Sequence, residues 1–172
     1  GGEISDSLPE AIAAMKAAGY DLIIAETAGI GQGDARIVDM CDLALYVMTP
    51  EYGAASQLEK IDMVDLADAV AINKFDRAGA DDALRDVRKQ VQRSKRAFSE
   101  PLEAMPVFGT MASRFNDDGV SALYQGLLEL LNARLELGWQ SRCTPPAQRH
   151  TTQRGVVIPP ERVRYLADIA RC

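Results

Sequence analysis

The 172-residue chain has 47% hydrophobic and 26% charged residues, a composition typical of a globular protein with room for one well-cored domain and an appendage. Its net charge of −6 gives no reason to expect a nucleic acid or an anionic membrane surface as a partner. No apolar run approaches the ~18 residues of a membrane span. The three scattered cysteines predict neither a disulfide framework nor a zinc site. We therefore expect a cytoplasmic protein.

The first predicted elements are a helix and a buried strand. Ser7 to Glu10 reads as a capping box with a proline in the first turn, and Gly19 is suited to ending the helix in a left-handed conformation. The run Asp21–Ala25 follows at once. Its apolar residues do not alternate with polar ones, which favours a parallel strand covered on both faces.

Polar and glycine residues follow this strand directly. Glu26 and Thr27 are hard oxygen ligands suited to Mg²⁺, and the glycines from Gly29 to Gly33 would let backbone N–H groups approach a phosphate. Gln32 is a candidate by chemical type for orienting an attacking water, although a glutamine in such a loop is as often a flexible surface residue. Taken alone, this stretch is equally compatible with an ordinary buried strand and a glycine-rich turn.

A second strand is predicted over Leu43–Met48, where an apolar run stops at Thr49-Pro50. A loop over Glu51–Ala54 then leads to a helix expected over about Ala55–Leu66. The candidate core contacts of that helix are Leu58, Ile61, Met63 and Leu66.

A third strand, Ala69–Ile72, precedes the NKFD motif, which consists of Asn73, Lys74, Phe75 and Asp76. An aspartate in this order accepts two parallel hydrogen bonds from guanine N1–H and N2–H₂, the lysine stem lies along the base or ribose, and the asparagine pins neighbouring loops. Adenine lacks that donor pair and would leave the carboxylate unpaired. Such a tetrapeptide alone is often a polar turn, but two motifs in this order, each at a strand end, favour a guanine-nucleotide site.

The remaining elements complete an alternating α/β pattern. A helix over Ala80–Phe98 has Leu84, Val87, Val91 and Phe98 at helical spacing. A fourth strand, Val107–Thr110, leads into a polar loop in which backbone N–H groups of Ala112 and Ser113 are placed to reach the base O6. The closing helix is expected to bury one apolar face, made of Val120, Leu123, Tyr124, Leu127, Leu128 and Leu131.

The composition changes at Gly138, where a polar stretch with adjacent prolines predicts a linker. Pro159 and Pro160 restart a helix with Val163, Leu166 and Ile169 on one face. We accordingly divide the chain into an α/β unit at 1–137 and a linker with a docking helix at 138–172. The expected fold is a mostly parallel sheet of the P-loop NTPase type with helices on both faces.

The phosphate-binding loop G-x-x-x-x-G-K-S/T, which opens a P-loop domain, occurs nowhere in these residues. A dinucleotide-binding loop is disfavoured, because Asp34 stands where its third glycine is required. We expect the C-terminal two-thirds of a GTPase domain, without phosphate loop or first switch, from a longer polypeptide. The alternative is a truncated G-like module that binds a protein partner and hydrolyses nothing.

The segments ETAGIGQGD, YVMTPEYGAASQLEKIDMVDLAD, AINKFD and PVFGTMASRFNDDGVSALY carry a family resemblance. Together they resemble the MeaB-like G-protein chaperones of adenosylcobalamin-dependent acyl-CoA mutases. The likeness is strongest to the GTPase domain embedded in fused isobutyryl-CoA mutases, and it covers roughly Leu8 to Leu131. The tail with VIPPERVRYLADIA resembles the linker to the acyl-CoA-binding barrel of those enzymes.

This resemblance implies a function and a set of site residues. The parent would hydrolyse GTP to gate the loading and protection of adenosylcobalamin on a mutase that interconverts isobutyryl-CoA and n-butyryl-CoA, with the cobalamin-binding and mutase domains in the same polypeptide and a homodimeric assembly. Glu26 and Thr27 would meet Mg²⁺, Gly29 would approach the γ-phosphate, and the NKFD motif would read guanine. Glu51, Gln57 and Lys60 would belong to an additional switch that signals towards the mutase.

Overall fold

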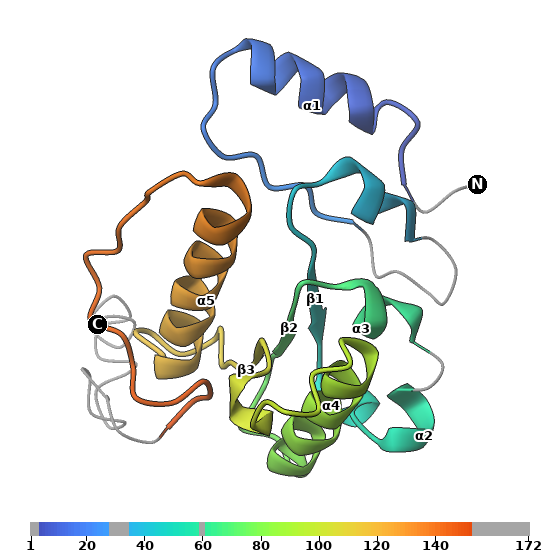
Figure 1. Cartoon of the computed structure of the whole chain (residues 1–172), viewed down its shortest axis with the longest axis vertical. Coiled ribbons are helices and arrows are strands. Elements are labelled where there is room, and N and C mark those ends of the chain that lie inside the picture. Colours follow the sequence, from blue (N-terminus) through green and yellow to red (C-terminus); the bar gives the residue numbers. More distant parts are fainter. Residues whose placement is uncertain (1–3, 28–34, 59–60, 153–172) are drawn as a thin grey trace, which may run out of the picture.

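The centre of the molecule is a three-stranded parallel sheet of order β1-β2-β3 (Figure 1). The computed structural model describes residues 4–27, 35–58 and 61–152. The strands are β1 (Leu45–Met48), β2 (Ala69–Ile72) and β3 (Val107–Gly109). Ala71 is opposite Val47 on one side and Phe108 on the other, so β2 is the inner strand. This confirms the predicted α/β class with a parallel sheet.

Helical crossovers connect the strands, as parallel pairing requires. The helical elements are α1 (Leu8–Ala17), η1 (Ala35–Met40), η2 (Pro50–Tyr52), α2 (Ala55–Leu58), α3 (Asp62–Leu66), α4 (Ala80–Ser94), η3 (Leu102–Ala104) and α5 (Asp118–Leu135). The prediction of a single helix over about Ala55–Leu66 is wrong, since this range contains the separate helices α2 and α3. Helices α4 and α5 lie on opposite faces of the sheet, which confirms the predicted layering (Figure 1).

The larger core lies between the sheet and α4. Because strand side chains alternate between faces, Val70, Ile72 and Val107 point to one side, and all three are at most 1% exposed. The buried stripe of α4 packs against them and consists of Ala83, Leu84, Val87 and Val91. Phe98, expected to extend this stripe, is instead 69% exposed, because α4 ends at Ser94 and the helical spacing is lost.

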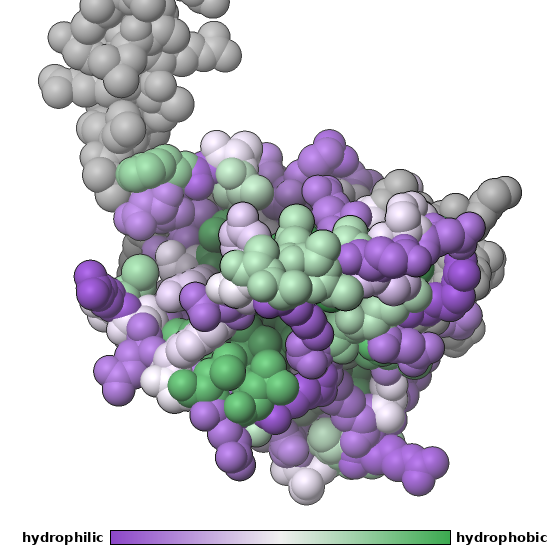
Figure 2. All heavy atoms as spheres, turned by 90° about the horizontal axis from the view of Figure 1, so that it is seen from above, coloured by the Kyte–Doolittle hydropathy of each residue, from purple (hydrophilic) through white to green (hydrophobic). Residues whose placement is uncertain are grey.

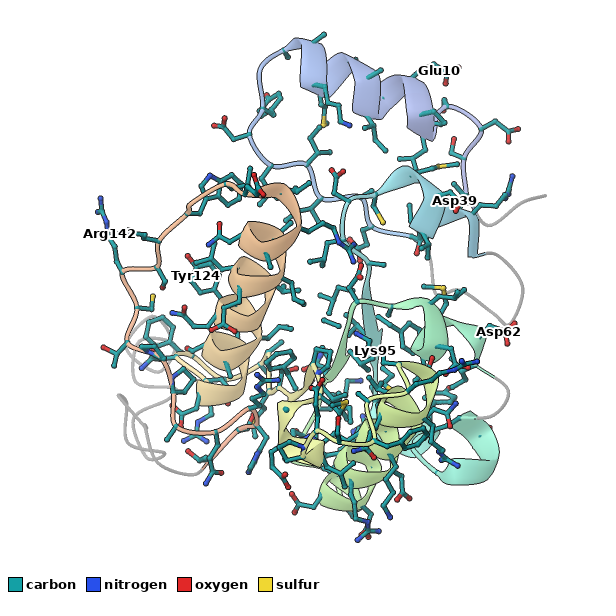
Figure 3. The ribbon with its side chains drawn as sticks, viewed as in Figure 1. Glu10, Asp39, Asp62, Lys95, Tyr124 and Arg142 are labelled. Carbon is teal, nitrogen blue, oxygen red and sulfur yellow. The ribbon has the colours of Figure 1, made fainter. Side chains whose placement is uncertain are left out.

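The opposite core lies under α5 and is built around the ring of Phe108. A Cβ added to Gly126 would lie 2.3 Å from Cζ of that ring, so the helix approaches the sheet through a residue without a side chain. Leu123 and Leu127 pack beside it, as expected. Tyr124 was expected in the core but is 47% exposed, and it projects from α5 away from the sheet (Figure 3). Gly126 faces the Phe108 ring because a larger residue would clash with it, and this orientation of α5 turns Tyr124 away from the sheet.

The predicted strand Asp21–Ala25 is wrong, since this segment has no strand pairing. Leu22 and Ile24 are 55% and 83% exposed, and α1 has no buried residue. Apolar side chains gather on the face that α1 occupies (Figure 2). An apolar run makes a strand only when a neighbouring strand pairs with its N–H and C=O groups, and no described strand pairs with this one.

Of the two predicted ends of α1, the C-terminal one is confirmed and the N-terminal one is not. Gly19 has the predicted left-handed conformation, with φ of 82°, after the helix. The prediction of a capping box is wrong, because the Ser7 side chain makes no cap hydrogen bond to the first turn. Ser7 instead contacts the hydroxyl of Ser5.

Two contacts fix the end of α5. Arg134 donates hydrogen bonds to both carboxylate oxygens of Asp68, which also accepts one from the backbone N–H of Ala44 at 2.8 Å. Beyond the helix, the Asn132 side chain donates to the carbonyl of Trp139 at 2.7 Å and accepts from its N–H at 2.9 Å. These bonds join the helix end to the start of β2 and to the turn that follows it.

The predicted linker is partly docked rather than free. The residues up to Thr152 run along α5 and return to the outer edge of β3 (Figure 1). Backbone hydrogen bonding needs no apolar side chains, which is why the polar composition did not reveal this contact. The predicted helix after Pro159 lies outside the described residues. Within the described ranges, no helix is long and apolar enough to cross a membrane.

Candidate guanine-nucleotide site

The carboxyl ends of the three strands are tied together at the NKFD motif. The N–H of Asn73 donates to the carbonyl of Met48 at 2.8 Å, and that of Thr110 donates to Ile72 at 2.8 Å. The side-chain oxygen of Asn73 accepts from the N–H of Ala112 at 3.1 Å. The prediction that the asparagine pins a neighbouring loop is confirmed.

The rest of the motif forms a turn whose conformation is set by its neighbours. Lys74 has φ of 57°, a left-handed conformation that is uncommon for a residue with a side chain and is found where surrounding contacts enforce it. The N–H of Phe75 donates to the carbonyl of Thr110 at 3.0 Å. Its ring lies so close to Gly109 that a Cβ there would be 2.5 Å from it. The side chains of Lys74 and Asp76 are exposed at this edge, free to meet a ligand.

The residues Met111–Asp117, which we call the base loop, are organised by the carboxylate of Asp117. This side chain is 3% exposed. One of its oxygens accepts from the N–H groups of Met111 at 3.1 Å and Val120 at 2.9 Å. Its second oxygen is buried and has no partner among the described residues. The same carboxylate therefore caps the N-terminus of α5 and joins the two ends of the base loop.

The two base-loop residues predicted to contact the base differ in availability. The N–H of Ala112 is already engaged by Asn73. The N–H of Ser113 finds no acceptor within the described part of the chain, and Ser113 is exposed. Ser113 is therefore the better-placed donor of the pair for a base oxygen.

The edge that carries the NKFD motif also carries Glu51, which lies in η2 after β1. Its carboxylate pairs with the guanidinium of Arg77, the residue directly after Asp76. Hydrogen bonds from Thr49 and from the backbone, together with the Arg77 contact, lower the pKa of Glu51 to about 2. Close packing supports this position, because a Cβ on Gly53 would lie 2.3 Å from that of Ala83 in α4.

Comparison with known families finds a match over most of the chain. Residues 1–155 match the model of the family described as methylmalonyl Co-A mutase-associated GTPase MeaB. The chain belongs to the MeaB GTPase family. The resemblance noted in the sequence is thereby confirmed.

Similar MeaB-family sequences occur within much longer proteins. The chain is 62% identical over 170 residues to a fused isobutyryl-CoA mutase of Paraburkholderia xenovorans, covering 98% of this chain and 13% of that protein. It is 61% identical over 171 residues to one of Cupriavidus metallidurans, covering 99% and 16% respectively. A fused isobutyryl-CoA mutase of Geobacillus kaustophilus is 48% identical over 168 residues, covering 98% and 15%. The chain thus spans about one-seventh of the length of these relatives.

The two phosphate-side residues that the structure describes, Glu26 and Thr27, are not brought to the NKFD motif. Glu26 is exposed and Thr27 is half-buried, and their segment lies towards the end of the sheet where β1 begins (Figure 1). Their oxygen ligands suit Mg²⁺, although no group of three or more His, Cys, Asp or Glu side chains within the described ranges forms a metal site alone. Gly29, Gln32 and Lys60 lie outside the described residues. Gln57 is exposed on α2.

Sequence reasoning missed Arg77, Asp117 and Thr151 at this edge. Asp117 carried a detectable signal, because an aspartate three residues before Val120 matches a helix N-cap. Arg77 and Thr151 had none, since their contacts join residues 26 and 34 positions apart in the chain.

Proposed function

We propose that this chain is the base-recognising part of a GTPase domain. The observation that carries the proposal is the bond from Ala112 to the Asn73 side chain, which joins the NKFD motif to the base loop. A guanine site needs these two segments to be fixed relative to each other, because one contacts the N1–H and N2–H₂ edge and the other contacts O6. Family membership supports the same function.

Within this proposal each exposed group has a separate task. Asp76 accepts the two hydrogen bonds from guanine, and the Lys74 stem lies along the base or ribose. Phe75 sets the position of the turn by packing on Gly109. The N–H of Ser113 donates to O6. Discrimination against adenine follows because adenine would leave the Asp76 carboxylate without donors.

The phosphate side of the proposed site uses Glu26, Thr27, Gly29 and, for water orientation, Gln32. A bound Mg²⁺ supplies neutralisation of the charge that develops on the phosphoryl group during transfer. Glu26 and Thr27 would hold it directly or through its waters, while the Gly29 N–H would approach the γ-phosphate. These residues must come to the carboxyl edge of the sheet, where ligands of open α/β sheets bind.

For the parent protein we propose the activity that the sequence resemblance implies. GTP hydrolysis gates the loading and protection of adenosylcobalamin on a mutase that interconverts isobutyryl-CoA and n-butyryl-CoA. The partners are then the mutase and cobalamin-binding domains of the same cytoplasmic polypeptide, which acts as a homodimer. Glu51, Gln57 and Lys60 transmit the nucleotide state towards the mutase, and adenosylcobalamin itself binds outside this segment.

The deciding experiment replaces one hydrogen-bond acceptor with a donor in the parent protein. Asp76→Asn places an NH₂ group opposite guanine N2–H₂, whereas xanthine presents a carbonyl there. We expect GTP binding to weaken by at least about 2 kcal/mol and xanthosine triphosphate binding to strengthen. Both affinities are measured by calorimetry on the same preparation.

A matched control is Asp81→Asn, which makes the same chemical change on an exposed residue in the first turn of α4. It should leave both affinities unchanged. Loss of both nucleotides in Asp76→Asn would indicate damage to the fold, and an unchanged preference for GTP would remove Asp76 from the site.

A further inference from the structure

The residues Arg149–Thr152, which we call the edge strip, add to the sheet beside β3. The N–H of Gly109 donates to the carbonyl of Arg149 at 3.0 Å, and the N–H of Thr151 donates to the carbonyl of Gly109 at 2.9 Å. His150 is therefore paired with Gly109 in parallel orientation. The strip covers the free edge of β3 at the level where the NKFD motif begins.

The start of the edge strip is anchored by Arg149. Its guanidinium donates to the carbonyls of Ala104 at 2.8 Å and Met105 at 3.0 Å. The same group lies 5.5 Å from the centroid of the Phe108 ring, a cation–π distance. These contacts fix the strip to the amino end of β3, independently of the base loop.

The end of the edge strip is bonded to the base loop. The hydroxyl of Thr151 donates at 2.9 Å to the oxygen of Asp117 that also accepts from Met111 and Val120. A side-chain hydrogen bond joins Thr152 to Asp118. Arg114, inside the base loop, donates to the carbonyl of Thr152 at 3.3 Å. The loop is thus held from the NKFD side by Asn73 and from the opposite side by the strip.

Packing leaves little room for this arrangement to shift. A Cβ on Gly119 would lie 1.9 Å from the carbonyl oxygen of Gly109 and 2.7 Å from the N of Thr151. The ring of His150 lies 5.7 Å from that of Phe75, centroid to centroid. The strip consequently contacts both segments of the proposed guanine site.

We propose that the edge strip is a positioning element of the guanine site. Thr151, acting through Asp117, holds the base loop where the Ser113 N–H meets the base, and it touches no nucleotide itself. Binding free energies are reciprocal, so a nucleotide that orders the base loop also strengthens the hold on the strip. The edge strip therefore responds to the nucleotide. This inference rests on the guanine-nucleotide function proposed above.

The test uses Thr151→Val in the parent protein, which removes the hydroxyl and keeps the branched shape. Thr151→Ser restores the hydroxyl, and Thr144→Val makes the same change at an exposed linker position. Thr151→Val loses the part-buried hydrogen bonds of the hydroxyl to Asp117 and to the Gly109 carbonyl, which should weaken GDP binding about fivefold with the turnover number little changed. Thr151→Ser and Thr144→Val should bind GDP as the unsubstituted protein does.

A second measurement needs no substitution. Hydrogen exchange of the amides at 149–152 should slow at least about threefold when GDP binds, while α4 amides remaining unchanged serve as the reference. Absence of this slowing, or equal GDP affinity in Thr151→Val and Thr144→Val, would overturn the inference alone. Failure of the unsubstituted parent protein to bind GDP would overturn the proposed function as well.

Discussion

The carboxylate of Glu51 is paired with the guanidinium of Arg77, so the segment after β1 contacts the residue that follows the NKFD motif. The two residues are 26 positions apart in the sequence, because one follows β1 and the other follows β2. In the structure the strands are neighbours and end at the same edge, which brings the side chains together. The proposed mutase-signalling segment therefore contacts the residue that directly follows the NKFD motif.

Glu51→Ala should consequently affect nucleotide binding as well as coupling. Both partners are 47% exposed, so solvent screens the pair and we expect a loss of GDP affinity of no more than about fivefold. Gln57→Ala should leave GDP affinity unchanged and reduce the effect of the mutase domain on the GTPase rate. Arg85→Ala, which removes an exposed ion pair on α4, serves as the control. A Glu51→Ala affinity equal to that of the control would show that the pair has no role in binding.

Glu26→Ala should lower GTP turnover in the parent protein far more than it weakens GDP binding. In the proposed site its carboxylate would help hold the ion that stabilises charge in the transition state, a contribution that would be largest during phosphoryl transfer. Single-turnover hydrolysis and GDP titration on one preparation separate the two effects. Equal losses in both, or unchanged turnover, would contradict the metal assignment.

The Asp68–Arg134 pair should make stability depend on acidity. Burial raises the pKa of Asp68, but the hydrogen bonds from Arg134 and Ala44 and the nearby positive charges lower it more, so the net direction is downward. A lowered folded-state pKa contributes stability above the unfolded-state value and loses it as the pH falls through the folded-state value. We expect the contribution to be complete at pH 7 and to decline below about pH 4.

A double-mutant cycle with Asp68→Asn and Arg134→Gln measures this contribution by urea unfolding. The coupling should be on the order of 1 kcal/mol at pH 7, because Arg134 is half exposed to solvent. It should shrink as the pH falls below about 4. Coupling that does not change with pH would mean that shape, and not charge, holds the two side chains together.

Gly126→Ala should destabilise the fold although alanine is the better helix former. Helix propensity favours alanine by about 1 kcal/mol, but the new Cβ would lie 2.3 Å from Phe108, and overpacking costs about 1–3 kcal/mol. Phe108→Leu in the same chain should relieve part of that cost. The reverse change at the exposed Ala133 controls for propensity alone. Greater thermal stability in Gly126→Ala would show that the helix can move outwards freely.

Local patterns predicted the parts of the structure that depend on local chemistry. The runs Ala69–Ile72 and Val107–Gly109 became strands, and the NKFD turn lies where its order indicates. The run Asp21–Ala25 carried an equally strong apolar signal but has no described strand beside it, so pairing decided the outcome. Tyr124 shows a second limit, because the size of Phe108, distant in sequence, set which side of α5 faces the sheet. The contacts of Thr151 and Arg77 depend on topology and leave no local trace.

The two hydrogen bonds between Asn132 and Trp139 hold a natural fluorescent probe at the end of α5. This is the single tryptophan of the sequence, half-buried at the point where the backbone leaves α5 through residues Glu136 and Gly138 with positive φ. Its emission therefore originates from one known place. A shift of the fluorescence maximum during a titration therefore reports a change in the surroundings of Trp139, at the junction between the α/β unit and the segment that follows it. No dye or added label is required.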